Sequence, residues 1–144
     1  MTPRTTETKK ETAGKAAKYF EAVGRRKTAV ARARLFKGGG KLVINGKPFN
    51  IYFPTKRYQK TVQAPLQTLN VAGEFDATVK VSGGGPTAQA EAVRHAFSRA
   101  LVKVNPDHRK RLRKNEFLTR DPRMVERKKY GLRKARRAPQ WAKR

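Results

Sequence analysis

The chain has no cysteine, few acidic residues and no long apolar run. Its 144 residues include 36 Lys or Arg but only ten Asp or Glu, which gives a formal net charge of +26. The absence of cysteine excludes disulfides, thiolate zinc sites and thiol redox chemistry. No window approaches the run of about eighteen apolar residues that a transmembrane helix needs. No predicted helix is basic on one side and apolar on the other along its whole length, so nucleic acid is a better polyanionic partner than a membrane surface.

The chain also lacks the residue sets on which enzymes depend. His95 and His108, the only histidines, lie in separate predicted helices without an acidic partner. Asp76 is a lone carboxylate on a predicted strand, which fits a salt-bridge partner better than a general base. We therefore expect no enzymatic activity, no cofactor and no metal site.

Residues 1–18 are rich in Thr, Lys and Ala and show no periodicity, so we expect a mobile N-terminal extension. They lack the apolar centre of a signal peptide. They also contain Glu7 and Glu11, which transit peptides avoid, so a cytoplasmic protein is expected.

Residues 19–104 carry the pattern of a folded α+β domain. Side chains alternate in 75–82 (FDATVKVS), which predicts a strand with Phe75 and Val79 facing inward. Alternation in 24–36 predicts one strand whose outer face includes Arg26 and Arg34. Asn45-Gly46 in KLVINGKPF indicates a tight hairpin turn. We expect a small sheet of three to four strands packed against two or three helices.

The predicted helices are punctuated by proline. Pro54 is expected to begin a helix, and Pro65 to interrupt it. Apolar residues at three- and four-residue spacing predict the strongest helix, from Pro86 to Val104. Asn105 has the features of an N-cap for a second helix in 105–118, which is basic nearly all round.

The most informative segment is the C-terminal tail, residues 119–144. From Asn105 onward there are sixteen Lys or Arg and four acids. A segment with this charge repels itself and buries too little apolar surface to fold alone, so we expect order only against a polyanion. Tyr130 and Trp141 could stack on unpaired bases, which favours looped or single-stranded RNA.

Two further segments leave alternatives open. In 24–28 (GRRKT) the cations are either a solvated strand end or part of an RNA-binding face, and the lack of acids from 23 to 43 favours the second. The run SGGGP, 82–86, is either a strand-to-helix turn or a phosphate contact at a helix N-terminus. It lacks the lysine of a nucleotide-binding loop, and a phosphotransferase would need paired carboxylates for magnesium.

A DNA-compacting basic protein is the main alternative function. In the tail, however, Arg exceeds Lys, seven to four, which suits folded RNA.

Four segments in order, GRRKTAVARARLF, the SGGGP turn with its helix, FLTRDPRMVERKKYG and KARRAPQWAKR, resemble the bacterial type of small-subunit ribosomal protein nine. The resemblance covers residues 19–144. It implies a left-handed βαβ crossover, an exception to the usual rule, in a fold similar to domain two of ribosomal protein five. It also implies assembly into the head of the small subunit beside neighbouring ribosomal proteins.

The resemblance further implies that the tail threads through small-subunit rRNA and that Lys143 and Arg144 contact the anticodon stem-loop of the peptidyl-site tRNA. The family commonly has Phe or Tyr followed by Ser where this chain has Trp141 and Ala142, Gly at Ala88, and Ala-Gly at 115–116. The resemblance and the charge pattern together lead us to expect rRNA contacts at Arg25, Arg26, Lys27, Arg32, Arg34, Gly83, Gly84, Gly85, Arg109, Arg111, Arg113, Lys114, Arg120, Arg123, Arg127, Lys128, Lys129, Tyr130, Arg133, Lys134, Arg136, Arg137 and Trp141.

Overall fold

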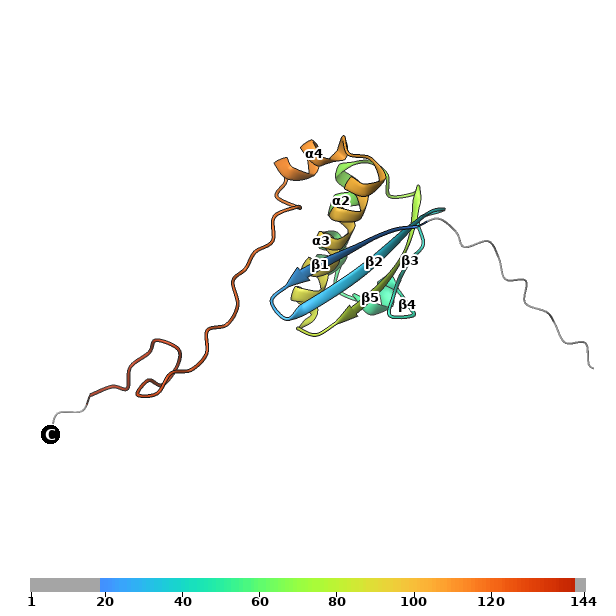
Figure 1. Ribbon diagram of the computed structural model, residues 1–144. Coiled ribbons are helices and arrows are strands. Elements are labelled where there is room, and N and C mark those ends of the chain that lie inside the picture. Colours follow the sequence, from blue (N-terminus) through green and yellow to red (C-terminus); the bar gives the residue numbers. More distant parts are fainter. Residues whose placement is uncertain (1–18, 142–144) are drawn as a thin grey trace, which may run out of the picture.

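The computed structural model describes residues 19–141, and it places a five-stranded sheet against helices on one side (Figure 1). The strand order is β1-β2-β5-β3-β4. β3 and β5 are parallel and are connected through α1 and α2, so they form a βαβ unit; the other pairs are antiparallel. The left hand expected for this crossover stays a prediction. The strands are β1 (Phe20–Arg26), β2 (Ala29–Lys37), β3 (Leu42–Ile44), β4 (Lys47–Pro48) and β5 (Phe75–Ser82).

The fold class is confirmed as α+β, with one strand more than expected. The predicted single strand in 24–36 is wrong, because the chain turns at Lys27 and Thr28 and pairs β1 with β2. Lys27 has a φ of 51°, a conformation that lysine rarely adopts, so its sequence gave no turn signal. The hairpin at Asn45-Gly46 is confirmed, with φ values of 50° and 77°.

The helices are α1 (Phe49–Tyr52), α2 (Lys56–Thr68), α3 (Pro86–Val104) and α4 (His108–Lys114). Pro54 does not begin a helix; it lies between α1 and the N-cap of α2, Thr55. Pro65 does not interrupt α2 either. It removes one backbone hydrogen bond from the helix but is itself buried, together with Leu66.

The core lies between the sheet and helices α2 and α3. The inner faces of β2 and β5 contribute alternate buried residues such as Leu35 and Val79, as their patterns predict. β2 presents mainly alanines, which lets α3 approach closely. Gly24 on β1 makes that approach possible, since a Cβ there would lie 2.1 Å from the carbonyl oxygen of Ala92. The close packing of α3 on β1 therefore requires a glycine at position 24.

The edge of β1 is covered by polar side chains of α3. Lys103 Nζ donates to the carbonyl oxygen of Glu21 at 2.7 Å, and Arg99 donates to that of Val23. His95 Nδ1 accepts the backbone N–H of Arg25 at 3.4 Å. These contacts satisfy backbone groups that an edge strand would otherwise expose.

α4 is shorter than the helix expected in 105–118, and its N-cap is Asp107, so the prediction of Asn105 as N-cap is wrong. Asn105 Oδ1 instead accepts the N–H of Asp107 in the turn before the helix. Its one buried residue is Leu112, and its cations are exposed. After α4, Phe117 and Leu118 still pack against the core, and the chain then extends away from the domain (Figure 1). Within the described residues, no helix is both long enough and apolar enough to cross a membrane. The expected N-terminal extension, residues 1–18, and the expected tRNA contacts Lys143 and Arg144 lie outside the described residues.

Candidate nucleic-acid interface

The tail is an extended cationic segment with little internal pairing. Between 119 and 141 it carries nine Lys or Arg and two acids. Glu126 binds Lys129 Nζ at 2.7 Å and Arg136 Nε at 2.9 Å, and these hydrogen bonds lower the pKa of Glu126. Other tail cations have no ion pair with the described residues: Arg120, Arg127, Lys128, Arg133, Lys134 and Arg137.

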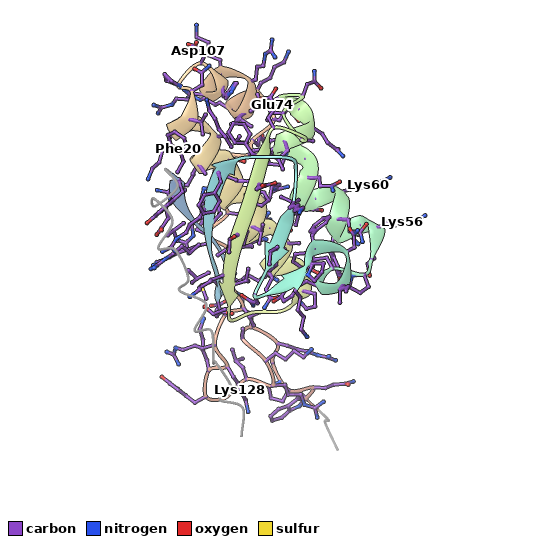
Figure 2. All side chains as sticks on the ribbon, turned by 90° about the vertical axis from the view of Figure 1, so that its right-hand side faces the viewer. Phe20, Lys56, Lys60, Glu74, Asp107 and Lys128 are labelled. Carbon is purple, nitrogen blue, oxygen red and sulfur yellow. The ribbon has the colours of Figure 1, made fainter. Side chains whose placement is uncertain are left out.

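The aromatic side chains of the tail are exposed. Tyr130 is 99% exposed and Trp141 is 87% exposed. Figure 2 shows Lys128 on the part of the tail that lies beyond the sheet. Rings with free faces among unpaired cations can stack on bases while the cations bind phosphates.

The start of the tail is held to the domain by Arg26. Its guanidinium pairs with Glu91 of α3 and, at 2.9 Å, with the carboxylate of Asp121. It also donates to the carbonyl oxygen of Arg123 at 3.0 Å. Hydrogen bonds from Arg123, with smaller contributions from its charge and that of Arg26, lower the pKa of Asp121 to about 2. We call this arrangement of Arg26, Glu91, Asp121 and Arg123 the tail clamp.

Comparison with known proteins identifies the family. The model of the family "Ribosomal protein S9/S16" matches residues 24–144. The chain is 52% identical over 124 residues to the small ribosomal subunit protein uS9 of Nocardia farcinica, covering 86% of this chain and 74% of that one. It is 52% identical over 122 residues to uS9 of Trichormus variabilis, covering 84% and 88%. It is 51% identical over 125 residues to uS9 of Mycolicibacterium smegmatis, covering 87% and 83%. The chain belongs to the ribosomal protein S9/S16 family.

Membership of the S9/S16 family decides the broad function. The chain is a structural protein of the small ribosomal subunit, with rRNA and other ribosomal proteins as partners, and it is not an enzyme. It acts in the cytoplasm, where ribosomes work. The DNA-compacting alternative is left without support.

The basic residues predicted on β1 and β2 occupy three different surroundings. Arg26 is not on the outer face: its strand partner is Ala29, whose side chain is buried, so Arg26 faces α3. Lys27 is exposed in the turn. Arg32 and Arg34 lie on the face of the sheet opposite the helices, where both bind Glu21, at 3.5 and 2.8 Å. The hydrogen bond from Arg34 lowers the pKa of Glu21.

The glycine run serves the fold at two of its three positions. Gly83 and Gly84 have φ values of 70° and 66°, and a Cβ on either would collide with Thr28 or Ala29. Gly85 has open space around it and precedes Pro86, the first residue of α3. The turn alternative therefore accounts for Gly83 and Gly84, and phosphate contact by the run stays a prediction.

Asp76 has a structural role that differs from the expected salt bridge. Its Oδ1 accepts the backbone N–H groups of Gly39 and Lys41, at 3.0 and 2.7 Å, and so closes the loop between β2 and β3.

Sequence reasoning missed the polar residues of α3 that face β1 and the tail. Glu91, His95, Arg99 and Lys103 recur every four residues, which places them on one side of a helix. That periodicity was available in the sequence, but the neighbouring apolar stripe is the stronger signal.

Proposed function

We propose that the chain binds small-subunit rRNA through three basic surfaces and contacts the peptidyl-site tRNA through its last two residues. The surfaces are the tail, the exposed side of α4 and the turn between β1 and β2. The final residues are Lys143 and Arg144, which contact the anticodon stem-loop, and the domain lies in the subunit head beside neighbouring ribosomal proteins.

The observation that carries the rRNA proposal is the tail beyond Arg123. Its unpaired cations and exposed aromatic rings make no ion pair or hydrogen bond with the domain within the described residues. The binding of such unpaired cations to a folded RNA is favoured by the release of counterions from the RNA phosphates. α4 adds Arg109, Arg111, Arg113 and Lys114, all exposed.

The tRNA contact is supported by the resemblance and by reach. The 26 residues from Thr119 to Arg144 span at most about 85 Å when extended. Arg144 can offer a phosphate two parallel N–H groups, which Lys143 cannot.

The experiment compares ribosomes carrying the full chain with ribosomes lacking Lys143 and Arg144. We expect normal subunit assembly and faster dissociation of peptidyl-site tRNA. A matched control, Lys9→Ala with Lys10→Ala, removes the same charge at the other end and should leave tRNA dissociation unchanged. Failure of the truncated chain to assemble, or unchanged tRNA dissociation, would contradict the proposal.

A further inference from the structure

A polar cavity lies where β1, α3 and the start of the tail meet. Its volume is about 240 Å³, below the ~300–1,000 Å³ typical of sites for whole small molecules. Five arginines and two acids line it, along with His95. It is thus a small, strongly cationic cavity in the folded domain, separate from the extended part of the tail.

The acids of the cavity are already engaged. Glu91 pairs with Arg26, and Asp121 pairs with both Arg26 and Arg123. Arg94 and Arg120, also in the lining, have no ion pair within residues 19–141. Arg25 contributes its backbone N–H, which binds His95, but its strand partner Val30 lies on the face of the sheet opposite the helices. Two guanidinium groups at one cavity therefore lack a counter-ion.

Arg94 supplies the second observation. Its Nε is shielded from solvent and has no hydrogen-bond acceptor among the described residues. Its guanidinium lies over the ring of Phe117, 5.5 Å from the centroid. The ring attracts the positive charge but supplies no oxygen acceptor for the N–H groups of the guanidinium. A buried donor without an acceptor is rare in folded proteins, and an anion would supply the missing acceptor.

His95 also lines the cavity, and its pKa depends on the charges around it. Burial, followed by the charges of Arg99, Arg94 and Arg120, lowers its pKa, against a hydrogen bond with the backbone of Leu118 that raises it. The ring is held on its other side by the N–H of Arg25. A neutral His95 thus adds no charge, but it will respond to an anion bound beside it.

We propose that this cavity binds a single phosphate group of the rRNA backbone, with Arg94 and Arg120 as donors. Phosphate suits guanidinium groups, which offer it paired N–H donors. A base is a poor fit, because Arg94 already covers the ring of Phe117. The inference rests on the proposed rRNA binding and adds a defined contact at the point where the tail leaves the domain.

The first arm of the test uses inorganic phosphate and the intact chain. NMR titration of the two histidines at constant ionic strength, with chloride as the reference anion, gives both pKa values. Phosphate should raise the pKa of His95 by about 0.5–1, because a nearby opposite charge favours the imidazolium. His108, on α4, is the internal control and should not move. An unmoved His95, or equal shifts of both histidines, overturns the proposal.

Variants assign the donors. Arg94→Gln and Arg120→Gln should each abolish most of the phosphate-dependent shift. Arg120 is exposed, so its replacement does not threaten the fold even if Arg94→Gln does. Arg57→Gln, an exposed arginine of α2 outside the cavity, is the matched control and should keep the full shift. A full shift in Arg120→Gln counts against the site.

The second arm replaces phosphate with a small-subunit rRNA fragment and separates RNA from free phosphate as the ligand. RNA should raise the pKa of His95, and Arg120→Gln should reduce the slope of log affinity against log salt by about 0.7–0.9, one phosphate contact. If free phosphate shifts His95 but RNA does not, the site is not an rRNA contact and the proposal fails. RNA that binds without either effect leaves the proposed function standing and refutes this site alone.

Discussion

Arg26 and Asp121 lie 95 positions apart in the chain, yet the guanidinium of one is 2.9 Å from the carboxylate of the other. The pair joins the last residue of β1 to the start of the tail. Its side chains are 16% and 30% exposed, so water screens it only in part. A tail expected to become ordered only against a polyanion is thus fixed to its own domain at its origin, and its initial direction is set by the fold.

Removing the Asp121 charge should free the start of the tail. Asp121→Asn weakens the pairs to Arg26 and Arg123, because the neutral amide attracts the two guanidinium groups less than the carboxylate does. The chain has no native cysteine, so spin labels can be placed at Gln67→Cys on α2 and at Met124→Cys. Asp121→Asn should broaden the measured distance distribution.

Glu126→Gln provides the control, because it removes the same charge from the tail two residues beyond the label and outside the clamp. Its distance distribution should stay as narrow as that of the parent chain. Equal broadening in both variants would show that tail charge, and not the clamp, sets the direction.

The sequence predicted those parts of the molecule in which neighbouring residues carry the signal. Strict alternation gave the β5 strand, and helical spacing gave α3. The break between β1 and β2 was missed because Lys27 and Thr28 are not turn formers and pairing with β2 alone imposes the turn. The high positive charge of residues 119–144 predicted the extended tail. The cavity could not be predicted, because it combines positions near 25, 94 and 120, which only the packing of α3 on β1 brings together.

Gly24→Ala should disrupt that packing. The new Cβ would lie 2.1 Å from the Ala92 oxygen and 2.4 Å from the Ala96 nitrogen, both backbone atoms that cannot rotate away. We expect a loss of about 2–3 kcal/mol in the free energy of unfolding, measured in urea. Gly73→Ala, whose Cβ meets nothing within 4 Å, should change it by about 0.5 kcal/mol at most. Similar losses in the two variants would mean that α3 can shift on β1.

Stability should fall as the pH drops from about 7 to 5. The pKa of His95 is lowered in the folded state, so below about 6.5 the unfolded chain takes up a proton that the folded chain does not. The free energy of unfolding begins to fall near the pKa of His95 in the unfolded chain, and it stops falling below the pKa of His95 in the folded chain. The lowered pKa values of Glu21, Asp121 and Glu126 add their losses only below about pH 4.5.

Urea unfolding across this pH range separates the two histidines. His95→Gln, whose amide can both donate and accept, should flatten the dependence between pH 7 and 5, whereas His108→Gln should retain it. A dependence that survives in His95→Gln would assign the effect to another group.

Added salt should stabilise the free protein. A net charge of +26 opposes compaction, and ions screen that repulsion over about 10 Å at 0.1 M. We expect the melting temperature to rise by about 5 °C between 20 and 500 mM NaCl, equivalent to roughly 1 kcal/mol in a domain of this size. Lys56 and Lys60 project outward from α2 (Figure 2), and both are exposed. Replacing both with Gln should therefore raise the melting temperature at low salt and reduce the response to NaCl. A melting temperature that falls with salt would mean that ion pairs such as Arg26–Asp121 outweigh the repulsion.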